Sequence, residues 1–299
     1  MPSSSPADRS RLYLAFLSVY LFWGSSYLAA RVGVRDLPPF LFVGVRFAIA
    51  GAVMLAISRL YRNRVLPQPR EWRDLAVLAC LGFLLANGIN IWALQYVSSN
   101  QAALLNASAP IWIVLMGAFG SRAHRPGRRA LMGVALGVVG TMLLIGKGAG
   151  ASGPLSAQLM ILVACFAWAV STIYLRSSGT VLPVLTLIGW QMFLGGLSLI
   201  VLGLVTGELP RWHWTQTAAI SMTYLIVFSS CCAHTAYAWL TTRTTPAKLG
   251  TYAYVNPAIA VVLGWLVLQE RLGVLQLIGM AVVLAGMLLI NWPRASRTG

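Results

Sequence analysis

Two stretches of the chain, FWGSSYLAAR at 22–31 and AWAVSTIYLR at 167–176, repeat one pattern at a distance of 145 residues. Their alignment matches Trp23 with Trp168. Further matches follow in order at offsets of 145 to 147: Ser26 with Ser171, Gly44 with Gly189, Gly51 with Gly196, Trp92 with Trp239, and Pro110 with Pro257. Ordered matches at a nearly constant offset indicate that the chain consists of two copies of one structural unit.

Each copy contains five apolar segments long enough to cross a membrane, for which about 20 mostly apolar residues are needed. The ten segments are 12–30, 38–58, 74–96, 100–120, 129–146, 157–175, 182–206, 214–240, 249–268 and 272–292. They predict an all-α membrane protein with ten transmembrane helices. The two five-helix repeats are expected at 12–146 and 157–292, with cytoplasmic tails at 1–11 and 293–299.

The number of segments in one copy determines how the two copies are related. Because five is odd, the second copy enters the membrane from the opposite side. The halves are therefore expected to be inverted about a pseudo-two-fold axis in the membrane plane. Inverted repeats around a central cavity are typical of secondary transporters.

Composition and charge support a membrane protein and exclude several other classes. The chain is 58% hydrophobic and 9% charged, with 22 Lys and Arg against 6 Asp and Glu. A soluble domain carries roughly a quarter charged residues, and a nucleic-acid partner would require a basic stripe on a polar domain. Sixteen of the cations fall on the side of the two tails, five on the other side, and Arg46 inside a segment. This bias predicts that both termini are cytoplasmic.

Several motifs resemble the EamA-type drug/metabolite transporter superfamily. They are FWGSSY at 22–27, VRFAIAG at 45–51, the prolines at 110 and 257, and QERL at 269–272. Within that superfamily the chain resembles the bacterial exporters of aromatic amino acids. The resemblance covers about residues 12–292. It implies a multi-pass protein of the bacterial inner membrane with alternating access, which exports amino acids with aromatic or bulky neutral side chains.

Polar residues at membrane depth are costly and therefore mark candidate substrate contacts. At an offset of 147, Asn87 matches His234 and Asn90 matches Tyr237. The spacing i,i+3 places each pair on one helix face, and we expect both faces to border a shared cavity. The alternative is that these side chains form hydrogen bonds between helices.

Trp23 with Ser26, and Trp168 with Ser171, offer a flat apolar wall next to a hydroxyl group, although an indole ring can also simply fill space between helices. Pro110 and Pro257 are expected to bend their helices as hinges, because proline removes a backbone hydrogen bond. The predicted substrate-binding residues are Trp23, Ser26, Asn87, Asn90, Asn106, Trp168, Ser171, His234, Tyr237, Tyr252 and Asn256.

Arg46 is the one charged residue well inside a predicted segment. It suits a substrate carboxylate through bidentate geometry, but it can also hydrogen-bond helix-end carbonyl groups. Proton-coupled carriers usually hold an Asp, Glu or His in the membrane. The six carboxylates all fall at segment ends or in loops, so His234 is the candidate for proton coupling. Facilitated diffusion is the alternative.

Other functions have less support in the sequence. Cys80, Cys165, Cys231 and Cys232 lack metal-ligand spacing, and no nucleophile–base pair or HExxH motif is present, so we expect no catalytic residue, metal or cofactor. Transport of a nucleoside or an organic anion remains an alternative, as do a channel and, more remotely, an intramembrane enzyme. The expected partners are an amino-acid substrate and the lipid bilayer, without nucleic acid, and the sequence leaves monomer and homodimer open.

Overall fold

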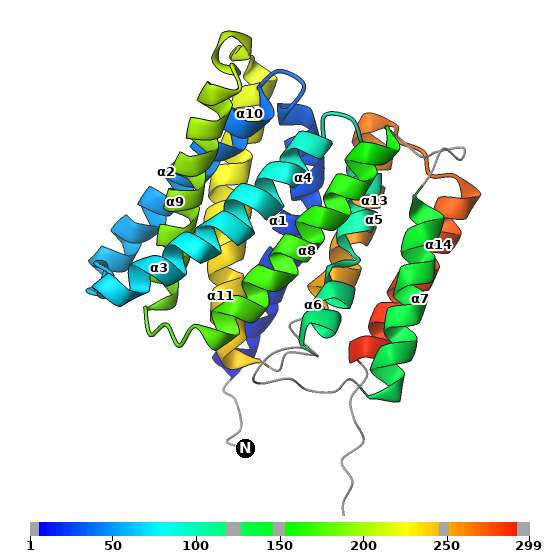
Figure 1. Cartoon of the computed structure of the whole chain (residues 1–299), viewed down its shortest axis with the longest axis horizontal. Coiled ribbons are helices and arrows are strands. Elements are labelled where there is room, and N and C mark those ends of the chain that lie inside the picture. The colour runs from blue at the N-terminus through cyan, green and yellow to red at the C-terminus, as the bar shows by residue number, and fades with distance from the viewer. Residues whose placement is uncertain (1–5, 118–126, 146–152, 245–250, 292–299) are drawn as a thin grey trace, which may run out of the picture.

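The computed structural model describes residues 6–117, 127–145, 153–244 and 251–291, all of whose regular structure is helical. The helices pack side by side as one bundle (Figure 1). In the first half they are α1 (Pro6–Gly33), α2 (Pro39–Leu60), α3 (Pro69–Leu78), η1 (Ala79–Asn87), α4 (Gly88–Ala93), α5 (Ser99–Asn106), α6 (Ala109–Gly117) and α7 (Arg128–Leu144). In the second half they are α8 (Leu155–Ser177), α9 (Val184–Val205), η2 (Leu209–Arg211), α10 (Gln216–Tyr224), η3 (Leu225–Ala233), α11 (His234–Arg243), α13 (Tyr252–Leu268) and α14 (Val274–Asn291).

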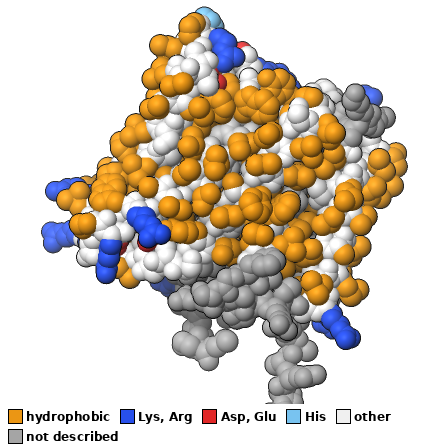
Figure 2. Space-filling model, viewed as in Figure 1, with side chains coloured by type: hydrophobic (Ala, Val, Ile, Leu, Met, Phe, Trp, Pro, Cys, Tyr) orange, Lys and Arg blue, Asp and Glu red, His pale blue; other side chains and the backbone are white. Residues whose placement is uncertain are grey.

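The chain is a multi-pass membrane protein. Within the described residues, six helical spans are long and apolar enough to cross a membrane: Ser10–Gly33, Pro39–Leu60, Pro69–Ala93, Leu155–Leu175, Val184–Val205 and Gln216–Tyr237. Tyr252–Leu268 and Val274–Ile290 are apolar but shorter. Hydrophobic side chains cover much of the face in Figure 2, as expected of a surface that contacts lipid. The predicted tail 293–299, residues 1–5 and parts of the predicted segments 100–120 and 249–268 lie outside the described residues.

Two of the long spans contain a π-helix in the middle. In the first half α3, η1 and α4 follow one another without a break, and η1 begins at Ala79. In the second half α10, η3 and α11 do the same, and η3 begins at Leu225. The two π-helices each have nine residues and start 146 positions apart. A π-helix widens the turn and is frequent at functional sites.

Glycines hold α2 tightly against α9. A Cβ atom added to Gly51 would lie 2.7 Å from the carbonyl oxygen of Gly189, and one added to Gly196 would lie 2.8 Å from that of Gly44. The two helices therefore pack antiparallel with their backbones in close approach. The residues that correspond at offset 145, Gly44 with Gly189 and Gly51 with Gly196, exchange roles in these contacts. The contact is therefore isologous, which means that each helix presents the same surface to the other.

α7 and α14 repeat this arrangement at the other end of the molecule. A Cβ atom on Gly140 would lie 2.9 Å from the carbonyl oxygen of Gly279, and one on Gly286 would lie 2.6 Å from that of Gly133. The pairs correspond at an offset of 146. Replacement of any of these four glycines by a larger residue would push the helix backbones apart.

The two prolines occupy different local structures. Pro257 lies inside the continuous helix α13, where a proline removes one backbone hydrogen bond. Pro110 does not lie inside a continuous helix: α5 ends at Asn106, and Pro110 is in the first turn of α6. A proline fits there because the first turn of a helix needs no backbone N–H donor. The fourth predicted segment is therefore broken at residues 107–108, where the hydroxyl of Ser108 donates to the carbonyl oxygen of Leu105 at 2.7 Å.

Candidate functional site: a central cavity

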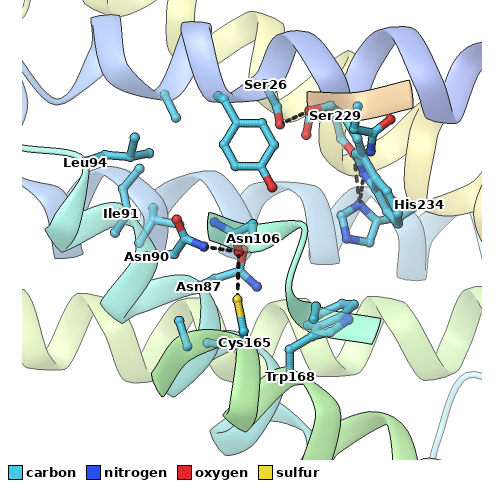
Figure 3. A pocket seen from close by; sticks show the side chains of 18 of the residues that line it. Ser26, Asn87, Asn90, Ile91, Leu94, Asn106, Cys165, Trp168, Ser229 and His234 are labelled. Atoms are coloured by element: carbon cyan, nitrogen blue, oxygen red, sulfur yellow. Dashed lines mark hydrogen bonds between the residues drawn. The ribbon is translucent and has the colours of Figure 1, made fainter. Parts of the chain in front are cut away.

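A cavity of about 190 Å³ lies inside the bundle (Figure 3). Both halves of the chain contribute to its wall. The lining residues are Trp23, Ser26, Tyr27 and Ala30 from α1, Val43 and Arg46 from α2, Ala86 and Asn87 from η1, Asn90 and Ile91 from α4, Leu94, Asn106 from α5, Ala109 from α6, Ala164, Cys165 and Trp168 from α8, Ser229 from η3, His234 from α11, and Tyr252 and Asn256 from α13. The volume suits a ligand smaller than the drug-sized molecules that occupy pockets of roughly 300–1,000 Å³.

Nine of the eleven predicted contact residues line this cavity, and Arg46 does so as well. Ser171 and Tyr237 are not in the lining. Ser171 is buried behind the wall, where its Oγ would lie 3.1 Å from a Cβ atom on Gly82. The ring of Tyr237 packs against Trp23, with ring centroids 5.0 Å apart. Both residues therefore support the lining.

A cluster of two amides and a thiol forms one side of the cavity. The Nδ2 of Asn90 donates to the Oδ1 of Asn106 at 2.7 Å, and the Sγ of Cys165 lies 3.6 Å from the same oxygen. Asn106 also donates to the carbonyl oxygen of Ala102 at 2.9 Å. Figure 3 shows the three side chains pointing toward one another. The cluster joins α4, α5 and α8 and presents neutral donors and acceptors to the cavity.

The ends of the two π-helices supply a second pair of polar groups. Asn87 donates to the carbonyl oxygen of Gly82 at 2.7 Å, and the Nδ1 of His234 lies 2.9 Å from the carbonyl oxygen of Ser229. Each side chain thus contacts the carbonyl group five residues earlier. Since Asn87 and His234 correspond at an offset of 147, the two halves bring matching groups to one cavity.

Aromatic rings form the wall next to His234. The Trp23 ring lies with its centroid 4.9 Å from that of His234 and 5.4 Å from that of Tyr252. The Nε1 of Trp23 donates to the carbonyl oxygen of Ser229 at 3.2 Å, so the indole is fixed in place. Trp168 enters from α8. Flat rings at several orientations suit stacking and edge contacts with an apolar or aromatic group.

Arg46 holds two helices together and also borders the cavity. Its Nε donates to the Oγ of Ser230 and its Nη2 to the Oγ of Ser229, both at 2.9 Å. These bonds tie α2 to η3. The side chain is 7% exposed and also lines the cavity. Hydroxyl groups therefore hold the guanidinium, and not the helix-end carbonyl groups that were one of the alternatives; Arg46 adds positive charge to an otherwise neutral wall.

Three lining residues with polar side-chain atoms were not predicted as contacts: Tyr27, Cys165 and Ser229. Two of them carried a usable signal, because Tyr27 stands four residues after Trp23 and Cys165 three before Trp168, which places each on the tryptophan's helix face. Ser229 stands five residues before His234. Only the wider π turn brings it to the same face, and an α-helical pattern does not reveal it.

Polar contacts close the bundle on the side where α1 ends and α5 begins. The guanidinium of Arg31 donates to the carbonyl oxygen of Leu94. The carboxylate of Glu270 accepts from the backbone N–H groups of Ser99 and Asn100, both at 3.0 Å, and from the hydroxyl of Ser99 at 2.8 Å. These bonds join α1 to the end of α4, and the segment after α13 to the start of α5.

Comparison with known proteins identifies the family. An inner membrane transporter of Escherichia coli K12 that is described as uncharacterized, YedA, is 30% identical over 283 residues, which cover 94% of this chain and 90% of the relative. The uncharacterized transporter YoaV of Bacillus subtilis is 23% identical over 96% of this chain and 99% of its own. A solved crystal structure, 22% identical, has the same fold, with a TM-score of 0.68 over 94% of this chain and 97% of that one.

The match to a family description covers nearly the whole chain. Residues 10–146 and, separately, residues 155–292 match the EamA-like transporter family. A small-molecule substrate and a place in the lipid bilayer follow for a transporter of this kind. The chain belongs to the EamA-like transporter family.

Proposed function

We propose that this protein is a secondary transporter that exports amino acids with aromatic or bulky neutral side chains. The observation that carries the proposal is the composition of the central cavity. Amide groups of Asn87, Asn90 and Asn106 lie in the same cavity as the rings of Trp23 and Trp168. A zwitterion with an apolar side chain needs both kinds of contact, hydrogen bonds for its backbone groups and a flat apolar wall for its side chain.

Alternating access requires two gates of opposite orientation, which inverted halves supply. Three observations support inversion of 12–146 relative to 157–292. The family matches the two halves separately, the π-helices start 146 residues apart, and the glycine contacts between α2 and α9 are reciprocal and antiparallel. In this proposal the bonds of Arg31 and Glu270 keep the outward gate closed, and they break when the carrier opens outward. Pro257 and the break before Pro110 act as hinges.

The distribution of charged and titratable residues supports an orientation in the membrane and names a candidate for proton coupling. The proposal places both termini in the cytoplasm of a bacterium, with the protein in the inner membrane, because Lys and Arg concentrate on that side. His234 is the candidate proton carrier, since it is the titratable imidazole in the cavity wall. An exporter that lets accumulated amino acids run down their gradient needs no coupling at all.

Proteoliposomes provide the test. Vesicles that hold the purified protein and are loaded with labelled phenylalanine, tryptophan or threonine are expected to release the label faster than protein-free vesicles. Release should saturate with concentration, and unlabelled substrate outside should drive counterflow, which a channel does not show. Efflux equal to that of the protein-free vesicles for every amino acid would reject the proposal.

An organic anion is the second candidate substrate, because Arg46 lines the cavity. A single guanidinium already bonded to two serines is weak support for a doubly charged ligand such as a phosphate ester. Inclusion of benzoate and a nucleoside monophosphate in the same efflux series separates the two candidates: efflux of these compounds without efflux of amino acids would favour the anion.

A further inference from the structure

A groove on the outer surface of the bundle lies between the α3–η1 span and α9. Its lining residues are Ala76, Ala79 and Cys80 on one side and Leu194, Leu197, Ser198 and Val201 on the other. Ala76 and Cys80 are exposed, and so are Leu197 and Ser198. The groove is thus nearly apolar and faces outward from a membrane-spanning part of the protein, away from the central cavity.

Two tryptophans stand at one end of this groove. Trp72 precedes Ala76 by one helical turn, and Trp190 precedes Leu194 by one turn. Their rings form an edge contact with centroids 5.0 Å apart. The Nε1 of Trp190 donates to the carbonyl oxygen of Val65 at 2.8 Å, which fixes the connection between α2 and α3 beside the groove. Both tryptophans lie near the start of a candidate span, Pro69–Ala93 or Val184–Val205, and tryptophan is enriched where membrane helices cross the headgroup level.

Positive charge collects at the same end. Residues 59–74 contain five arginines and two acids. Arg64 is paired with Glu71 at 2.7 and 2.8 Å, and Asp74 accepts from the hydroxyls of Tyr174 and Thr180. Arg70 and Arg73 are exposed and take part in neither of the two salt bridges found among the described residues. Figure 2 shows Lys and Arg side chains at the edge where α2 ends and α3 begins.

We propose that this groove binds an anionic phospholipid, with one acyl chain between α3–η1 and α9 and the phosphate group at Arg70 and Arg73. The small side chains of Ala76 and Ala79 leave room for the chain, and the tryptophan pair sits at the level of the glycerol backbone. The arginines supply the preference for a negative headgroup, because basic side chains near a membrane surface attract anionic lipids. The site requires only that the protein crosses a membrane, so it is independent of the transported substrate.

Native mass spectrometry of the detergent-solubilised full chain measures this binding directly. Dioleoyl-phosphatidylglycerol and dioleoyl-phosphatidylcholine share their acyl chains and differ in net charge. We expect the phosphatidylglycerol lipid to bind about thirtyfold more tightly, as two arginines at a headgroup would produce. The double variant R70Q/R73Q should lose this preference, and S198F, which fills the groove, should weaken binding of both lipids.

A matched control removes the same charge elsewhere. Arg128 and Arg129 are exposed at the start of α7, and R128Q/R129Q should bind both lipids as the wild type does. Thermal unfolding of each variant without added lipid confirms that it is folded. Equal affinity of the wild type for the two lipids would overturn the proposal. So would an equal loss in both double variants, which would indicate a diffuse charge effect, or a dimer that S198F abolishes, which would assign the groove to a second copy of the chain.

Discussion

The side-chain amide of Asn87 donates a 2.7 Å hydrogen bond to the carbonyl oxygen of Gly82, five residues earlier in the same span. His234 repeats the relationship with Ser229 at 2.9 Å in the other half of the chain. Both pairs stand at the end of a π-helix, where the wider turn leaves the backbone carbonyl within reach. The two polar groups that face the cavity from equivalent positions are therefore each fixed by their own backbone.

Replacement of His234 by asparagine is expected to be tolerated, because asparagine stands at the equivalent position 87 of the first half. His234→Asn keeps an amide that can reach the carbonyl oxygen of Ser229, whereas His234→Leu removes the polar group and costs about 1 kcal/mol of stability. Thermal unfolding and efflux rates compare the two variants. If His234 carries the coupled proton, His234→Asn abolishes the dependence of transport on a pH gradient and leaves exchange intact. Equal transport by the Leu and Asn variants would contradict a role for the polar group.

Arg46 is expected to act first as a tether. Arg46→Lys keeps the charge but cannot reproduce the two bonds to Ser229 and Ser230, so stability should fall by about 1–3 kcal/mol. Phenylalaninamide, which lacks the carboxylate, is the diagnostic substrate. If Arg46 does not bind the carboxylate, the variant changes the KM of phenylalanine and phenylalaninamide by the same factor. A rise confined to phenylalanine would assign the carboxylate to Arg46.

Glu270 is expected to hold the closed gate. Glu270→Gln removes a charged acceptor from two N–H groups and a hydroxyl, which weakens closure by about 1.5–3 kcal/mol. The measurement is labelling of an Ala30→Cys reporter in the cavity by a membrane-impermeant thiol reagent, in a chain without its native cysteines. We expect labelling from the outer side to accelerate at least tenfold, as this free energy implies.

Glu208→Gln is the matched control for the gate. Glu208, which precedes η2, also accepts from a helix N-terminus, the N–H of Leu41 at 2.8 Å. This contact is at the start of α2, away from the contact between Glu270 and the start of α5. Its replacement should leave the labelling rate of the reporter unchanged. An equal acceleration in both variants would mean that the reporter detects general loosening of the fold.

Gln191 corresponds to Arg46 at an offset of 145, but it lacks equivalent partners. Its Nε2 is buried without a hydrogen-bond acceptor among the described residues. Gln191→Met should therefore be neutral or raise stability by about 1 kcal/mol. Gln101 is the control, because its Nε2 donates to the carbonyl oxygen of Leu144 and its Oε1 accepts from Gln276. Thermal unfolding should show a loss for Gln101→Met, and a similar loss for Gln191→Met would reveal an acceptor for that amide.

The sequence pattern predicted the all-helical membrane fold and half of the residues that line the cavity, because both depend on the spacing of residues along helices. Trp23, Asn87 and Trp168 were found from the repeat alone, since matching residues at equal depth converge on one interior. Family membership, through motifs such as FWGSSY and QERL, was confirmed by the comparisons.

Features that depend on local backbone geometry were not predictable in this way. The π-helices of both halves consist of ordinary apolar residues, so no pattern marked their wider turns. The sequence predicted a bend at Pro110, but the helix ends at Asn106 and a new one begins at Ala109. A proline in an apolar run does not reveal whether it lies in the middle of one helix or in the first turn of the next. Arg46 donates to hydroxyl groups on η3, more than 180 positions away in the sequence. The spacing of residues along one helix carries no information about such a contact.

Counterflow of labelled phenylalanine in proteoliposomes tests most directly whether the central cavity carries the substrate. The wild type should show saturable counterflow, and Trp168→Ala should lower the rate about tenfold, or ~1.4 kcal/mol, near the upper range for a specific aromatic contact. Trp265, a membrane-helix tryptophan that is 57% exposed outside the cavity, provides the control, and Trp265→Ala should retain the wild-type rate. Wild-type vesicles without counterflow, or Trp168→Ala vesicles that exchange phenylalanine as fast as the wild type, would contradict the assignment of the substrate to this cavity.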